Sequence, residues 1–140
     1  MSTSGLKTRF SDRDNIKLYS TEEIGESDIM SEPDYWERSF MAGSTKLYIL
    51  SVLSKGPLHG YGVLKEIKDK SDGCCTITPG TIYPVLRELE RDGFIVSSKA
   101  MTSGRTRITY ELTSRGKQVL DAGLIKWESH IEGAKKILGL

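Results

Sequence analysis

Cysteine and histidine are scarce in this 140-residue chain, which contains two of each. The cysteines, Cys74 and Cys75, are neighbours, and adjacent residues reach disulfide geometry only with strain. A fold held together by disulfides is therefore not expected. Neither His59 nor His130 belongs to a recognisable nucleophile or metal motif, and the chain lacks the ligand spacings of a zinc site. We expect no enzymatic activity, no bound metal and no cofactor.

Long apolar runs are also missing. No stretch approaches the roughly 20 apolar residues that a membrane-spanning helix needs. The first residues, MSTSGLKTRFSDRDN, have no apolar core of the signal-peptide kind. We therefore expect a cytoplasmic protein with no membrane partner.

Charge is distributed unevenly along the chain, although its net value is only +1. Residues 1–43 contain 5 Lys and Arg against 9 Asp and Glu, whereas residues 44–140 contain 15 against 10. Such asymmetry can indicate contact with nucleic acid. We expect an acidic and partly disordered extension over 1–43, a folded domain over 44–112 and a final helix over 113–140. A short helix over Asp34–Met41 is possible within the extension.

Apolar periodicity predicts two helices early in the folded domain. The first runs from about Ser44 to Ser54 and is mostly buried, because leucines recur every third residue at Leu47, Leu50 and Leu53. Gly56-Pro57 ends it, since proline restricts the residue before it and cannot continue a helix. The second helix spans about His59–Lys70, and His59 is expected to have a cap-like or packing role. Its expected inward-facing residues are Tyr61, Leu64 and Ile67.

The third helix has the clearest signals. Thr78 is a natural N-cap, and Pro79 suits the first helical position, where a missing N–H costs nothing. Pro84 should produce a local kink without breaking the helix. One buried face follows the i, i+3, i+4, i+7 pattern at Ile82, Val85, Leu86 and Leu89.

A hairpin and a long helix complete the chain. Phe94–Ala100 and Thr106–Leu112 read as strands joined by a turn at Ser103-Gly104. The helix over about Thr113–Leu138 has a nearly heptad apolar seam, formed by Val119, Leu120, Leu124, Trp127, Ile131, Ala134 and Leu138. A seam of this kind is buried against another helix, and a second copy of the chain is the simplest partner. We predict a homodimer with an α+β, mainly α fold.

The exposed residues suit double-stranded DNA. An α-helix fits the major groove, and helix N-termini favour phosphate, so Thr78 and Thr81 are placed to meet the backbone. Tyr83 and Arg87 lie about one turn further on, where they could reach base edges or backbone. On the hairpin, Lys99, Arg105 and Arg107 could grip flanking phosphates or enter the minor groove.

Three segments resemble the PadR-type winged helix-turn-helix transcriptional regulators. They are LYILSVLSKGPLHGY (Leu47–Tyr61), TPGTIYPVLRELERDGFI (Thr78–Ile95) and GRTRITYELTSRGK (Gly104–Lys117), in the family's order and spacing. The resemblance implies a dimeric DNA-binding protein, usually a repressor, that a small molecule releases from its operator. It also implies that the seven residues named above touch DNA, and that residues 44–112 are the DNA-binding domain. The single final helix resembles that of the short subfamily, which dimerises through it.

Some members of that subfamily bind flat aromatic molecules between tryptophans of the final helix, and Trp127 falls at the matching place. Trp127 is therefore the candidate effector-binding residue, with an ordinary dimer-core tryptophan as the alternative. Two other functions stay open. The first is a protein-interaction module that docks through a patch of Tyr35, Trp36 and Phe40, a patch that could also cover the core or a partner subunit. The second is a thiol or metal sensor that uses Cys74 and Cys75, in the metal case with His59.

Overall fold

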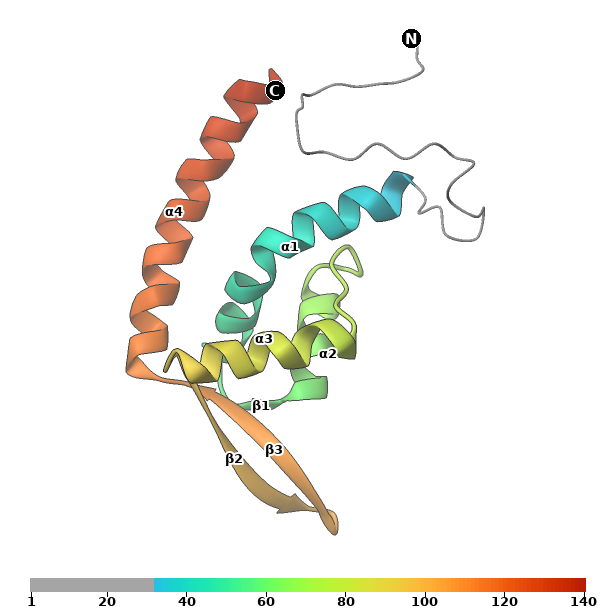
Figure 1. Ribbon diagram of the computed structural model, residues 1–140, viewed down its shortest axis with the longest axis vertical. Coiled ribbons are helices and arrows are strands. Elements are labelled where there is room, and N and C mark those ends of the chain that lie inside the picture. The colour runs from blue at the N-terminus through green and yellow to red at the C-terminus, as the bar shows by residue number, and fades with distance from the viewer. Residues whose placement is uncertain (1–31) are drawn as a thin grey trace, which may run out of the picture. The chain divides into compact units, whose positions relative to one another are not determined.

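The computed structural model describes residues 32–140 (Figure 1). In chain order its elements are α1 (Glu32–Leu53), β1 (Leu58–His59), α2 (Gly60–Lys70), α3 (Pro79–Arg91), β2 (Ile95–Thr102), β3 (Arg105–Leu112) and α4 (Ser114–Leu138). Three helices, a hairpin that projects from them and a long final helix make up a mainly helical α+β fold, as predicted. None of the helices in the described residues combines the length and apolarity needed to cross a membrane.

The first helix is longer than the sequence indicated. We expected a separate segment over Asp34–Met41 and a new helix from Ser44, but α1 is continuous through both. The hydroxyl of Ser44 donates to the carbonyl of Phe40 at 3.0 Å, and that of Thr45 donates to the carbonyl of Met41 at 2.7 Å. Both side chains thus bond back to the preceding turn, so they sit inside a helix instead of starting one. The disorder expected for residues 1–31 lies outside the described residues.

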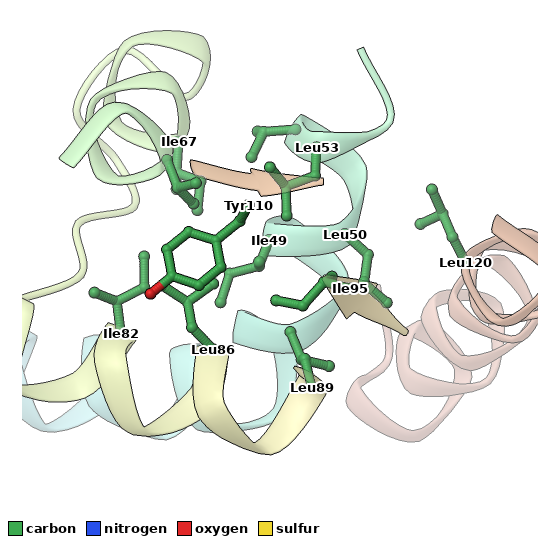
Figure 2. Close-up of a cluster of buried hydrophobic side chains, with 12 residues drawn as sticks. Ile49, Leu50, Leu53, Ile67, Ile82, Leu86, Leu89, Ile95, Tyr110 and Leu120 are labelled. Carbon is green, nitrogen blue, oxygen red and sulfur yellow. The ribbon is translucent and has the colours of Figure 1, made fainter. Parts of the chain in front are cut away.

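The core lies between α1, α2, α3 and the base of the sheet (Figure 2). Its buried side chains include Ile49, Leu53, Val63, Ile67, Ile82, Leu86, Leu89, Ile95 and Tyr110. The predicted inner faces of α1 and α3 are confirmed. The face of α2 was predicted wrongly at Tyr61, which is 68% exposed, whereas Val63 is fully buried. The buried positions of α2 are Gly60, Val63 and Ile67, a 3-then-4 spacing that turns Tyr61 outward.

Helix α3 begins at Pro79, as predicted, and ends at Arg91. Thr78 has the extended backbone of an N-cap, but its hydroxyl makes no cap bond and instead lies 3.2 Å from the hydroxyl of Thr81. The helix runs unbroken through Pro84. Because Pro84 is near the N-terminus, only one internal hydrogen bond is lost there.

The three strands form a sheet in the order β1-β3-β2, with both pairings antiparallel. Ser103 and Gly104 both have positive φ, 53° and 75°, as a two-residue type I′ hairpin turn requires. Strand β1 was not predicted, because two residues are too short for an alternation pattern. It places His59 opposite Thr109 of β3 and so ties the start of α2 to the hairpin.

Helix α4 is anchored at its first turn. Thr113 is its N-cap: the hydroxyl oxygen accepts from the N–H of Gly116 at 3.0 Å, and the hydroxyl donates to the carbonyl of Gly93 at 2.8 Å. The backbone N–H of Thr113 donates to the carbonyl of Phe94 at 3.1 Å. Gly116 is buried against Phe94, and a Cβ there would come within 2.0 Å of the Phe94 carbonyl oxygen. Beyond this turn, Leu120 is the one large apolar side chain of α4 that is fully buried.

Candidate nucleic-acid interface

A groove of about 730 Å³ lies between the start of α2, the outer face of α3 and strand β3. Four of the seven predicted DNA-binding residues line it: Tyr83, Arg87, Arg105 and Arg107. The other lining residues include His59, Gly60, Tyr61, Glu90, Ser97 and Tyr110. The fold therefore brings together side chains from the recognition helix and from the hairpin around one concave surface.

The side chain of Tyr83 packs directly against the backbone of Gly60 in the neighbouring helix, because Gly60 has no Cβ. A Cβ built on Gly60 would lie 2.7 Å from the Tyr83 hydroxyl and 2.8–2.9 Å from two of its ring carbons. A side chain at position 60 would therefore displace the ring. Tyr83 remains 39% exposed and lines the groove.

Tyr110 forms the floor of the groove, and three neighbouring side chains influence the pKa of its hydroxyl group. Burial raises the pKa of Tyr110, and the nearby Tyr83 and Glu90 raise it further, while Arg87 opposes them. Glu90 in turn accepts hydrogen bonds from the hydroxyl of Ser97 at 2.6 Å and from its backbone N–H at 3.3 Å. These two hydrogen bonds link α3 to β2 and partner the Glu90 carboxylate within the fold.

The remaining three predicted residues lie elsewhere. Thr78 and Thr81 are exposed together at the start of α3. Lys99 pairs with Ile108, whereas Arg107 pairs with Ala100 and Arg105 with Thr102. Because side chains alternate across a strand, Lys99 lies on the opposite face of the hairpin from Arg105 and Arg107. Lys99 and the two arginines therefore present their charges on opposite faces of the hairpin.

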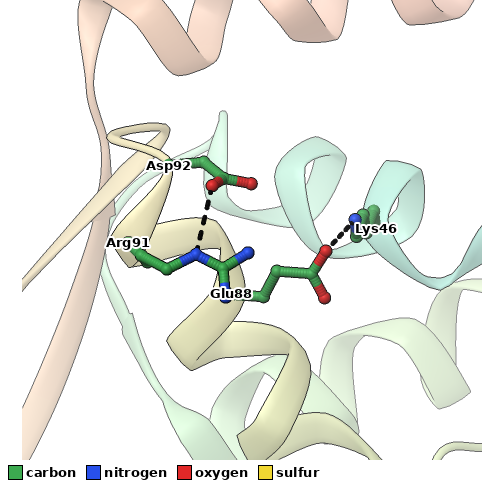
Figure 3. A network of polar contacts seen from close by, with 4 residues as sticks. All are labelled: Lys46, Glu88, Arg91 and Asp92. Atoms are coloured by element: carbon green, nitrogen blue, oxygen red, sulfur yellow. Dashed lines mark hydrogen bonds and ion pairs between the residues drawn. The ribbon is translucent and has the colours of Figure 1, made fainter.

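Two charged residues of α3 outside the groove form ion pairs. Glu88 accepts an ion-pair contact from Lys46 of α1 at 2.5 Å, and Arg91 bonds Asp92 at 3.4 Å (Figure 3). Within residues 32–140, Arg87 and Arg105 form no salt bridge. Their charges are thus available to a ligand.

Two groove residues were missed as binding candidates. Tyr61 was assigned to the core, and only the 3-then-4 spacing of Gly60, Val63 and Ile67 could have placed it outside. His59 was expected to have a cap-like or packing role, and the structure shows the cap: its Nδ1 accepts from the N–H of Gly62 at 3.0 Å. Its other ring nitrogen, Nε2, lies 3.0 Å from Nη1 of Arg107. No sequence signal connects residues so far apart in the chain.

A second, largely apolar groove of about 840 Å³ separates α1 from α4, and Trp127 lines it. The two helices are close at Gly123, where a Cβ would lie 3.1 Å from a methyl group of Leu47. Further along, the ring of Trp127 meets Tyr48 edge-on, with 6.4 Å between centroids. The predicted seam of α4 therefore borders an open groove instead of a packed helix.

The residues of the two alternative functions are well defined. Trp36 and Phe40 stack on α1 with ring centroids 5.7 Å apart, and both are exposed, as is Tyr35. These aromatics do not cover the core. Cys74 is exposed and Cys75 half-buried. Burial raises the pKa of the Cys75 thiol, which lowers its thiolate fraction near pH 7 and disfavours a reactive thiol.

The family model of the transcriptional regulator PadR-like family matches residues 49–122, just over half of the chain and the whole of the first groove. The protein belongs to the PadR-like family of transcriptional regulators. The resemblance to this family that the three sequence motifs indicated is thereby confirmed. The two relatives described next are both named as transcriptional regulators.

Individual relatives agree with this assignment. The chain is 31% identical over 102 residues to transcriptional regulator Rv3488 of Mycobacterium tuberculosis, covering 73% of this chain and 90% of that protein. It is 32% identical over 91 residues to the negative transcriptional regulator PadR of Bacillus subtilis, but spans only 50% of that protein's length.

Solved structures of PadR-like proteins share the fold. A PadR family transcriptional regulator from Eggerthella lenta superposes with a TM-score of 0.67 at 27% identity, covering 75% of this chain and 90% of that one. Bacillus subtilis PadR, crystallised in complex with operator DNA, superposes with a TM-score of 0.54 at 33% identity, covering 58% of this chain and 46% of that one.

Proposed function

We propose that this PadR-like protein is a homodimeric, sequence-specific DNA-binding repressor that a small aromatic molecule releases from its operator. The observation that supports DNA binding best is the first groove, where Tyr83, Arg87, Arg105 and Arg107 converge from two elements. The operator complex of Bacillus subtilis PadR and that protein's name as a negative regulator are consistent with a DNA ligand and with repression.

In this proposal α3 enters the major groove. The N-terminal end of α3, with Thr78 and Thr81, meets the phosphate backbone, because free N–H groups and the helix dipole attract anions there. Tyr83 and Arg87 then face base edges or the adjacent backbone. Arg105 and Arg107 contact flanking phosphates or the minor groove. Lys99, on the opposite face of the hairpin from Arg105 and Arg107, contacts a separate stretch of backbone.

Dimerisation through α4 is supported by its unpartnered apolar surface. Leu124 and Leu138 of the seam are exposed, and Trp127 and Ile131 are only half-buried. A second copy of α4 would cover these side chains. Two α3 helices related by a two-fold axis would then engage half-sites roughly 34–36 Å apart, one turn of the duplex.

The effector would occupy the second groove. Its volume of about 840 Å³ and its apolar lining around Trp127 suit a flat aromatic molecule. Binding there would change the separation of the two α3 helices by moving α4, and that separation sets the fit to consecutive major grooves.

Selection of bound duplexes from random DNA tests the proposal. Arg87→Ala and Arg105→Ala should each weaken binding of the selected duplex by about tenfold or more. Arg91→Ala is the matched control, since it removes the same charge one turn along α3, outside the groove, and should bind like the parent. If both groove variants bind as tightly as the parent at physiological salt, the proposed DNA surface is wrong. Affinity should also fall steeply with salt, through counterion release.

The exposed stack of Trp36 and Phe40 supports a second candidate, a protein-interaction module that uses the same fold. A module of that kind would show no preference among DNA sequences, so the selection would return no enriched motif. In that case Trp36→Ala with Phe40→Ala should abolish partner binding without changing the fold.

A further inference from the structure

We infer that His59 is a phosphate-binding residue of the DNA interface, and that His59 and Arg107 hold one phosphate oxygen between them. The assignment rests on the proposed DNA-binding function and adds to it a residue from outside the recognition helix and the hairpin.

Sheet register places the two side chains together. Strand β1 pairs with β3 so that His59 lies opposite Thr109. Arg107 precedes Thr109 by two residues and therefore projects from the same face of the sheet, as the diagonal neighbour of His59. Its Nη1 lies 3.0 Å from Nε2 of the imidazole, and both residues line the first groove.

The cap at the start of α2 decides which ring nitrogen carries the proton. Nδ1 of His59 accepts from the backbone N–H of Gly62 at 3.0 Å, so this nitrogen must be bare. A neutral imidazole with a bare Nδ1 carries its proton on Nε2. Nε2 is then a donor, and it faces the guanidinium of Arg107, which has donors only. Two donors thus lie 3.0 Å apart and share no acceptor.

The competing arrangement, with Nε2 accepting from Arg107, is the weaker one. It would put a proton on Nδ1 against the N–H of Gly62, which is fixed by the first turn of α2 and has no partner further back in the helix. The Gly62 bond is half-buried, whereas the Arg107 contact is exposed on a long side chain that can move. The cap therefore prevails, and Nε2–H stays directed into the groove.

The missing partner is an acceptor with negative charge. One phosphate oxygen has lone pairs for both N–H groups and also compensates the charge of Arg107, as a neutral carbonyl would not. Arg87 and Arg105 on the same groove favour the same ligand. A backbone phosphate of the bound duplex meets all these requirements. The bond from Gly62 holds the imidazole of His59 in one orientation, so the donor that meets this phosphate is fixed in position.

Two substitutions separate the cap from the phosphate contact. In His59→Asn, the amide oxygen can replace Nδ1 as cap acceptor, because asparagine is a good N-cap, but no donor reaches the position of Nε2. We expect the same melting temperature as the parent and about tenfold weaker binding of the duplex selected from random DNA. Arg107→Gln should weaken binding by a similar or larger factor. The double variant should bind no more weakly than Arg107→Gln, since both side chains serve one phosphate. Arg91→Gln is the control for loss of one surface charge.

Duplexes in which one phosphate at a time is replaced by a neutral methylphosphonate identify the contact. At one position, the replacement should weaken DNA binding by the parent protein but leave binding by His59→Asn and by Arg107→Gln unchanged. In the DNA-free protein, imidazole nitrogen-proton correlation by NMR should place the proton on Nε2. A proton on Nδ1, a His59→Asn variant that binds like the parent, or different phosphates for the two variants would each overturn the assignment. A parent that binds no duplex would instead remove the proposed function, and this contact with it.

Discussion

A hydrogen atom in place of a side chain at Gly60 lets the ring of Tyr83 lie across the start of α2. The ring touches the position that a Cβ would occupy, so the two residues are matched to each other. Gly62, two residues later, is under no such constraint: its nearest neighbours would be 3.5 Å from a Cβ, an ordinary contact. The missing side chain of Gly60 therefore shapes the candidate interface, whereas Gly62 contributes only its backbone N–H, which an alanine would keep.

Gly60→Ala should weaken DNA binding about five- to tenfold while changing the free energy of unfolding by less than about 1 kcal/mol. The new methyl group displaces Tyr83 from the groove, and the displaced ring is exposed, so little packing is lost. Binding to the selected duplex and thermal unfolding measure the two effects. Gly62→Ala, in the same helix, should leave affinity unchanged. Equal affinities for the two variants would show that Tyr83 has no part in binding.

The long helix α4 depends on its first turn for its place on the domain. Thr113 caps the helix and also bonds the carbonyl of Phe94, and Gly116 allows that carbonyl to approach. The helix has few other contacts with the rest of its own chain, since Leu120 is its only large apolar residue that is fully buried among those described. Its direction is therefore set by this turn, by Leu120 and by the contacts of Gly123 and Trp127 with α1.

Gly116→Ala should destabilise the fold by about 1–3 kcal/mol, because its Cβ would meet a backbone oxygen that cannot rotate away. Thermal or urea unfolding measures the change. Gly133→Ala is the matched control in the same helix: nothing lies within 4 Å of its Cβ, so it should be neutral or stabilising by up to about 1 kcal/mol. A Gly116→Ala protein as stable as the parent would contradict the described anchor.

The single chain leaves two surfaces uncovered: the charged groove beside α3 and the apolar groove between α1 and α4. In the proposed dimer the second surface controls the spacing of the first. The α4 seam and the outward residues of the same helix can be distinguished, because Ile131 borders the groove whereas Ile137 is 85% exposed and lies outside the seam.

Ile131→Asp should convert the dimer to a monomer, because an unpaired carboxylate would be buried in the helix-helix contact at a cost of several kcal/mol. Ile137→Asp, which introduces the same charge outside the seam, should remain dimeric. Sedimentation or light scattering of both variants measures the mass in solution. A parent that is already monomeric would contradict the α4 interface directly.

Much of the fold could be predicted from residues close together in the sequence. Thr78-Pro79 marked the start of α3, Ser103-Gly104 marked the hairpin turn, and His59 was recognised as a cap. Local backbone preferences and the bonds of one turn decide such features. The length of α1 was misjudged because Ser44 and Thr45 favour caps in general, and only the surrounding helix turns their hydroxyls back to the preceding carbonyls.

The candidate site was predictable only in part. Sequence periodicity placed Tyr83 and Arg87 on the exposed face of a helix, and the predicted hairpin led to Arg105 and Arg107. The groove that unites them depends on how α3 packs against the sheet. Tyr61 was misplaced because a helix of eleven residues offers few apolar positions from which to choose a face. Lys99 was grouped with the arginines because strand register, which sets its face, cannot be read from one chain.

Several local features of this protein are determined by residues a few positions apart. They are the start of α3, the tight turn of the hairpin and the heptad spacing of α4. The contacts that give it a candidate interface join distant residues. Gly60 meets Tyr83, and His59 meets Arg107 across 48 positions. Such pairs arise only when packing of the buried faces and antiparallel pairing of β1 with β3 bring the two segments together, because no property of either segment specifies the other's position.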